Sequence, residues 1–202
     1  MHKHLLSASL AATLAATFAL PAQAVTFEGA VTQGGTTVVD YSAMGLLSFD
    51  IDFANTASAV LSFMIESGDV AGGQPIAMSA MLRNFAGTGF PGYQLALGSG
   101  AFGAIGTVTR QFSGTTNVTV DGGNTATLSF NTPEFLDVEI GNVLGTTPGA
   151  TNWTLTGLQA GDRLSLSVSV VPEPGTYALM LAGLAVGGFI ARRRSIGQPR
   201  RG

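Results

Sequence analysis

The chain has 202 residues and no cysteine, and its two histidines and its lysine all lie within the first four residues. Disulfides, thiol chemistry and Cys-zinc sites are therefore excluded. Between residues 25 and 171 the same holds for His-based metal sites and for Ser-His-Asp or Cys-His catalysis. That segment carries eleven acidic side chains and three arginines, a net charge of −8, which disfavours nucleic acid as a partner.

The first 24 residues have the pattern of a secretory signal peptide. A basic start, His2-Lys3-His4, precedes an apolar run over 5–20. The small residues Ala22 and Ala24 then form an A-x-A pattern, which predicts cleavage after Ala24. The alternative is an uncleaved membrane anchor, and the two small residues argue against it.

Residues 25–171 have the length of one domain with a substantial core. Short alternating runs rich in β-branched residues recur between turn signals, which predicts an all-β fold, an antiparallel β-sandwich of jelly-roll type. A Gly-rich β-solenoid is the second choice, disfavoured because the sequence has no repeat period.

Two runs alternate most regularly, 47–53 and 164–170. In the first, the apolar residues should face the core, whereas Ser48, Asp50 and Asp52 should face solvent. Weaker strands are predicted at 36–41, 59–65, 76–84, 93–97, 105–112, 117–120, 126–130, 135–140 and 152–156. The Asp-Gly-Gly-Asn run at 121–124 predicts a hairpin turn.

Carboxylate pairs are the remaining candidates for catalysis. Asp137 and Glu139 would share one face of a strand, with Glu134 just before them. A spacing of about 7 Å along the strand suits a glycosidase pair, which acts across a cleft. Neighbouring side chains on one exposed strand make no cleft, so a solvated polar face is the favoured interpretation.

Asp50 and Asp52 are a candidate calcium site, because they offer two carboxylates on one face of a strand. Asp40, Asp121 and Asp162 could add ligands from loops. No EF-hand or repeat-type calcium motif accompanies them, and a solvated face is again the favoured interpretation.

Exposed aromatic side chains are candidate platforms for sugars, because rings stack on sugar faces. Trp153 shares a face with Leu155 and is assigned to the core. Phe90 and Tyr93, in the run Phe-Pro-Gly-Tyr, predict an exposed loop platform, and Tyr41 near a turn is a further candidate.

Residues 172–202 read as a neck, an apolar segment and a basic tail. Pro172 and Pro174 predict an exposed, extended neck. The uncharged run 176–191 makes a helix of about 24 Å, a marginal single transmembrane helix for a hydrocarbon core of about 30 Å. A buried core helix is disfavoured because this segment has no polar face. The cluster Arg192-Arg193-Arg194 should stay on the cytoplasmic side, which places the domain outside the cytoplasm.

The order Val171-Pro172-Glu173-Pro174, apolar helix and arginine cluster resembles the PEP-CTERM sorting signal. The resemblance covers about the last 30 residues. It implies recognition by an exosortase, a membrane-embedded cysteine transpeptidase-like enzyme, with cleavage near Pro-Glu-Pro and export to the cell surface or extracellular matrix. Bacteria with this system typically make exopolysaccharide and form biofilms, so the resemblance also implies exopolysaccharide as a partner.

Together these observations predict a non-enzymatic surface or matrix protein that needs no cofactor. One alternative is a carbohydrate-binding module, assisted by calcium or not. The other is a glycan hydrolase or lyase that works with carboxylates alone.

Overall fold

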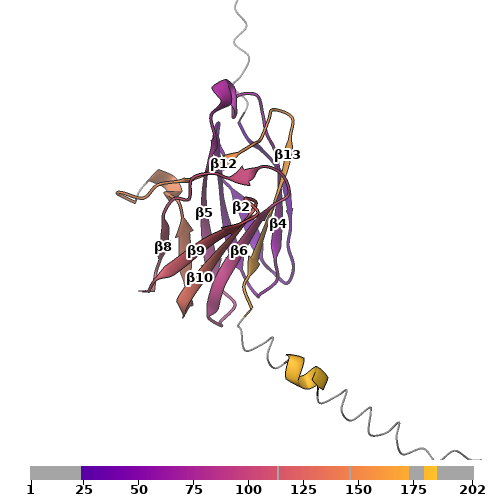
Figure 1. Cartoon of the computed structure of the whole chain (residues 1–202), viewed down its shortest axis with the longest axis vertical. Coiled ribbons are helices and arrows are strands. Elements are labelled where there is room, and N and C mark those ends of the chain that lie inside the picture. The colour runs from indigo at the N-terminus through magenta and orange to yellow at the C-terminus, as the bar shows by residue number, and fades with distance from the viewer. Residues whose placement is uncertain (1–23, 113, 146, 173–179, 186–202) are drawn as a thin grey trace, which may run out of the picture.

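The computed structural model describes residues 24–112, 114–145, 147–172 and 180–185. Two β-sheets pack face to face around one apolar core (Figure 1). The prediction of an all-β sandwich is therefore confirmed. Of the predicted helix 176–191, the described residues 180–185 are helical, and the rest lies outside the described residues. Within the described part of the chain, no helix has the length and apolar character needed to cross a membrane.

The first sheet contains β1 (Thr26–Val31), β4 (Ala59–Met64), β6 (Phe90–Leu97), β9 (Thr116–Asp121), β10 (Thr125–Glu134) and β13 (Arg163–Val170). The second contains β2 (Thr37–Asp40), β3 (Leu46–Phe53), β5 (Ile76–Asn84), β7 (Ala101–Phe102), β8 (Val108–Arg110), β11 (Asp137–Ile140) and β12 (Trp153–Thr156). The first sheet runs in the order β1-β4-β13-β6-β10-β9. The second runs β2-β3-β5-β11-β8, and β12 pairs with β5 and β7. Two short 3₁₀ helices, η1 (Ala71–Gly73) and η2 (Val143–Gly145), lie in loops.

Alternating side chains of the two sheets form the core. Every second residue of β3, from Leu47 to Phe53, is fully buried, and β13 buries Leu164, Leu166, Val168 and Val170 in the same way. Trp153 is buried as predicted. The predicted hairpin at 121–124 connects β9 to β10. Asp121 pairs with Thr125, so the turn has three residues, and Gly122 and Gly123 both have positive φ.

The arrangement departs from the sequence-based prediction in three places. β3 and β5 run parallel, whereas an antiparallel sandwich was predicted. A parallel pair needs a crossover connection, and here the chain makes it through β4 in the opposite sheet. β1 was missed, because a bulge between Phe27 and Gly29 breaks its alternation. The two-residue strand β7 was missed as well.

The two ends of the described domain leave from opposite ends of the sandwich. Thr26 pairs with Met64, which pairs with Arg163 at the start of β13. Val170, at the other end of β13, pairs with Tyr93, close to the pairing of Phe90 with Glu134. We call the end where β13 finishes the exit end, because residues 171 and 172 leave the sandwich there (Figure 1).

Candidate functional site

The junction with the sorting segment lies directly after β13. Val170 is largely buried, and the backbone N–H of Val171 donates to the Gly92 carbonyl at 3.0 Å. Pro172 is exposed. A cavity of about 310 Å³ lies beside the junction and is lined by Thr56, Thr88, Gly89, Phe90, Pro91, Val170, Val171 and Pro172. The change from buried strand to exposed chain therefore occurs within three residues.

Other predicted sorting and processing residues cannot be placed. Ala22, Glu173, Pro174 and Arg192-Arg193-Arg194 lie outside the described residues. Ala24 is described, and it leads into β1 at the end of the sandwich opposite the junction.

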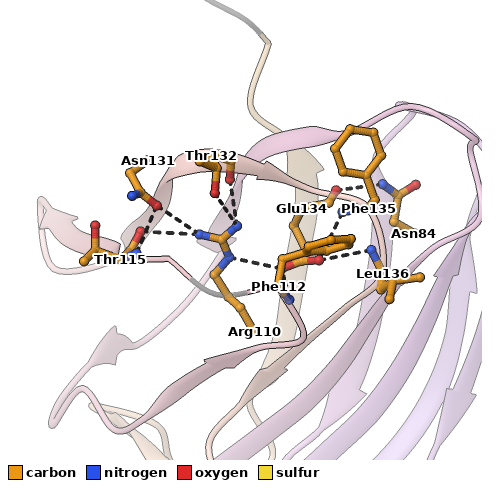
Figure 2. A network of polar contacts seen from close by, with 9 residues as sticks. All are labelled: Asn84, Arg110, Phe112, Thr115, Asn131, Thr132, Glu134, Phe135 and Leu136. Carbon is orange, nitrogen blue, oxygen red and sulfur yellow. Dashed lines mark hydrogen bonds and ion pairs between the residues drawn. The ribbon is translucent and has the colours of Figure 1, made fainter.

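A buried ion pair lies at the exit end, between Arg110 and Glu134 (Figure 2). The Arg110 Nε donates to Glu134 Oε2 at 3.1 Å, and the two side chains are only 2% and 0% exposed. The Glu134 carboxylate also accepts the backbone N–H groups of Phe112, Phe135 and Leu136. Four donors thus satisfy a carboxylate that water cannot reach, which buried charge requires.

The remaining donors of Arg110 join two further segments of chain. Its Nη2 donates to the Thr132 carbonyl at 2.7 Å, and its Nη1 approaches Asn131 Oδ1 and the Thr115 carbonyl at 3.4 Å (Figure 2). The guanidinium also lies 4.4 Å above the ring centre of Phe130. Arg110 therefore ties β8, on the edge of the second sheet, to β10 in the first.

The sequence pattern does not predict this pair. Glu134 belongs to one acidic stretch with Asp137 and Glu139, yet Glu134 points into the protein and the other two do not. A signal was available, because Glu134 stands between Pro133 and two large apolar residues. A lone carboxylate in such a setting needs a cation, and the domain has only three arginines.

The candidate calcium residues Asp50 and Asp52 both bind Arg83. Its Nη2 lies 2.6 Å from Asp50 Oδ2, and its Nη1 lies 2.9 Å from Asp52 Oδ1. Burial acts to lower the pKa of Arg83, but hydrogen bonds and charges from both aspartates outweigh this and raise the pKa. Across the described part of the chain, no group of three or more His, Cys, Asp or Glu residues is placed to hold a metal ion.

The predicted solvent-facing side of β3 is more enclosed than expected. Ser48 is 4% and Asp50 is 6% exposed, so the prediction of a solvated face was wrong for these two residues. Ser79 Oγ donates to Ser48 Oγ at 3.0 Å, and Arg83 extends over Asp50. β3 is an inner strand of its sheet, and long side chains from the adjacent strand β5 shield its polar groups.

Asp137 and Glu139 share one face of β11, as predicted, but each has its own surroundings. Burial, which the nearby Arg83 only partly offsets, raises the pKa of Asp137, and Asp52, Glu134 and Asp50 add to the rise. Glu139 accepts the backbone N–H of Val143 and the hydroxyl of Thr147, and so fixes the following loop. The two carboxylates therefore serve separate interactions.

The predicted aromatic platform at 90–93 was wrong. Phe90 and Tyr93 are fully buried in β6, where they pack on each other and on Phe53. The Tyr93 hydroxyl has no hydrogen-bond partner among the described residues, and burial raises its pKa. Tyr41 is exposed, as expected. Four other exposed apolar side chains lie at or near the exit end: Phe85, Phe112, Phe135 and Leu136.

Comparison with known proteins identifies the C-terminal segment. A family model for the PEP-CTERM protein-sorting motif matches residues 170–194. This motif implies sorting by an exosortase, with export to the cell surface or extracellular space. No curated protein and no solved structure matches the chain. The motif thus covers the junction and the segment beyond it.

Breaking the Arg110–Glu134 pair should destabilise the domain strongly. Glu134→Gln or Arg110→Met leaves one buried charge without its partner, and we expect the free energy of unfolding to fall by about 3–5 kcal/mol. Urea unfolding of the two single variants and of the double variant measures this loss. The double variant should lose less free energy of unfolding than the sum of the two single losses. Arg163→Met is the control, because it removes the exposed pair with Glu28 and should cost less than about 1 kcal/mol.

Asp137→Asn should stabilise the domain at neutral pH. The folded state raises the pKa of Asp137, so it binds this proton more tightly than the unfolded chain does. Stability is therefore lost as pH rises through the folded pKa, and the loss is complete above it. Thermal unfolding at pH 7 should show a higher Tm for Asp137→Asn, and the gain should shrink as pH falls towards the usual carboxyl range. A gain of the same size at all pH values would contradict this explanation.

Proposed function

We propose that this chain, which carries a PEP-CTERM sorting motif, is an exported β-sandwich protein that an exosortase cuts in the neck after Pro172. In this proposal the cut protein then works at the cell surface or in the extracellular matrix without catalysing a reaction. The single observation that carries the proposal is the position of the junction: the motif begins at residue 170, where β13 ends.

A cut after Pro172 would leave the fold complete. β13 lies between β4 and β6 in the first sheet, and its four inward side chains belong to the core. Val171 still makes a backbone hydrogen bond to Gly92, whereas Pro172 is exposed. A cut before Val170 would remove core residues, so the neck is the first place where the chain can be divided without cost to the domain.

Before the cut, the apolar run 176–191 would hold the chain in the membrane. It carries no charge, and Arg192-Arg193-Arg194 follow it. The arginines favour the cytoplasmic side, so the sandwich would stand outside the cytoplasm. The neck is then the covalent connection between the domain and the membrane segment, and it is the segment that the exosortase must reach.

The engagement of the carboxylates supports a non-catalytic role. Glu134, Asp50 and Asp52 are paired with arginine, and Glu139 holds a loop. With no histidine, lysine or cysteine between 25 and 171, these acids are the main candidates for acid–base chemistry. A carboxylate-only hydrolase or lyase would need two acids that converge in a groove, and Asp137 and Glu139 serve different neighbours instead.

Exopolysaccharide is the proposed extracellular partner, and glycan binding is the second candidate function. A cavity of about 350 Å³ between β8 and β9 favours it. Its lining is mostly polar and includes one aromatic residue; the lining residues are Gly106, Val108, Arg110, Phe112, Gly114, Thr116 and Val118. Glu134 neutralises the one charged lining residue, Arg110, so the groove suits a neutral sugar better than a charged ligand.

Intact mass and fractionation of the protein from its native host, with and without the exosortase, test the proposal. We expect a chain from Val25 to the neck outside the wild-type cell, and a longer, membrane-bound chain in the mutant. The released and uncut forms should unfold at the same temperature, because the cut falls outside the sandwich. A mass that retains Arg192-Arg193-Arg194 in both strains would contradict processing, and a mass ending before Val170 would contradict the proposed position.

A further inference from the structure

Asp69 is a buried carboxylate without a side-chain cation. It is 3% exposed, and among the described residues no arginine lies within ion-pair distance of it. Its oxygens accept three backbone N–H groups: Oδ1 those of Val25 at 3.0 Å and Gly45 at 2.8 Å, and Oδ2 that of Glu66 at 2.8 Å. A buried carboxylate is stable only when it is hydrogen-bonded, and a paired cation adds to that stability.

One of these donors is the residue that signal-peptide cleavage would make the first of the chain. Val25 follows the A-x-A pattern that ends at Ala24, and it is 4% exposed. Hydrolysis of the Ala24–Val25 bond consumes one water and leaves a carboxylate on Ala24 and an ammonium group on Val25. That nitrogen already lies 3.0 Å from Asp69 Oδ1. The cleavage therefore places a positive charge beside the buried negative one.

We infer that Asp69 is a binding site for the chain's own amino-terminus, and that the Val25 α-ammonium forms a buried ion pair with it after export. An ammonium has three donors where the amide has one, and its hydrogen bonds to a carboxylate are stronger. The domain's surplus of acidic residues favours the added positive charge further. Correct processing of the leader thereby becomes part of the fold, since only a chain that begins at Val25 can make this contact.

The composition of the chain gives a direct test. Its lysine lies in the leader, so the processed protein has one primary amine, at its amino-terminus. We compare the wild type with a variant that carries Gly-Ser inserted between Ala24 and Val25, both exported by a host and checked by intact mass. The probe is an N-hydroxysuccinimide ester, which acylates only the uncharged, accessible amine.

The buried ammonium should react about tenfold more slowly than the amine of the insertion variant, and urea should abolish the difference. In the chain without the insertion, Asp69→Asn should make acylation faster. The wild type should also have a higher Tm than the insertion variant. If Asp69→Asn fails to fold, the insertion variant alone decides, because it keeps Asp69 and the Val25 amide. Equal acylation rates in folded protein, or a processed chain that begins at a residue other than Val25, would overturn the inference.

The exit end carries a group of exposed apolar side chains. Phe85, Phe112, Phe135 and Leu136, which we call the exit patch, are 65%, 46%, 50% and 52% exposed. Phe112 and Phe135 are in edge-to-face contact, with ring centres 6.0 Å apart. Leu136 accepts the backbone N–H of Asn84 through its carbonyl, which brings Phe85 alongside. Large exposed apolar side chains gathered in this way usually mark an interaction surface.

The exit patch lies next to the point where the chain leaves the sandwich. Phe135 packs over Gly89, where a side-chain carbon would come within 2.6 Å of its ring. Gly89 in turn lines the same cavity as Val171 and Pro172. The buried ion pair beneath the patch, Arg110 with Glu134, has no net charge. The patch therefore presents apolar rings over a neutralised interior beside the neck.

The geometry also points to the membrane surface as the occupant of the exit patch before the chain is cut, which rests on the proposed function. Only the short run 172–175 separates the junction from the apolar segment 176–191. The exit end must then stay close to the bilayer, and aromatic and leucine side chains are stable at its interface. The bilayer holds the sandwich in one orientation, with the neck at the membrane surface where a membrane-embedded enzyme can reach it.

Fluorescence quenching tests this orientation. Trp153 is buried and gives a constant background, so one added tryptophan reports its own surroundings. Uncut chain from an exosortase-free host is reconstituted in phosphatidylcholine vesicles with or without bromine on the acyl chains. Phe135→Trp should lose about half of its added emission to the brominated lipid. Met44→Trp is the matched control, 56% exposed at the opposite end, and should lose none.

If Phe135→Trp disturbs the packing on Gly89, Phe85→Trp carries the same test. Vesicle-bound chain in which neither tryptophan at the exit patch is quenched would overturn the inference and leave the proposed function standing. If the emission of these tryptophans instead changes with protein concentration, the patch binds a second copy of the chain. That result also overturns the inference. Failure of the uncut chain to bind vesicles at all would contradict the membrane stage of the proposed function itself.

Discussion

The rest of the structure depends on the position of β13. This strand is an inner strand of the first sheet, and it is also the last piece of chain before the sorting segment. It pairs with β4 on one side and with β6 on the other, and its inward residues belong to the core, so the fold depends on it. The chain must consequently change from buried strand to exposed neck between Val170 and Pro172. The sorting segment therefore begins where the folded domain ends, and the position of each limits the position of the other.

A second constraint is the scarcity of positive charge. Each of the three arginines in the sandwich is paired with an acid, and the most buried pair, Arg110 with Glu134, joins the edge strand β8 to β10. Four acids that lack an arginine accept backbone N–H groups instead: Asp40, Asp69, Glu139 and Asp162. A fold without disulfides, lysine or histidine thus fixes its loops through carboxylates that bind the backbone.

The two ends of the sandwich have different tasks in the proposals. At one end the amino-terminus returns to a buried carboxylate in the loop before η1, so the start of the mature chain is built into the fold. At the other end the chain leaves beside exposed aromatic rings. The long β13 keeps these ends apart. Processing at the leader and at the neck therefore occurs at opposite ends, and neither cut needs to disturb the core.

The sequence by itself determined the all-β class, the two most regular strands, the burial of Trp153 and the sorting motif, because alternation and local motifs depend only on neighbouring residues. The tertiary structure decided the parallel pairing of β3 with β5, the burial of Phe90 and Tyr93, and the partners of the acids. Glu134 and Asp69 read as ordinary acidic residues until distant backbone amides and Arg110 are brought to them. Contacts between residues far apart in the chain set the charge environment, and a local pattern carries no record of them.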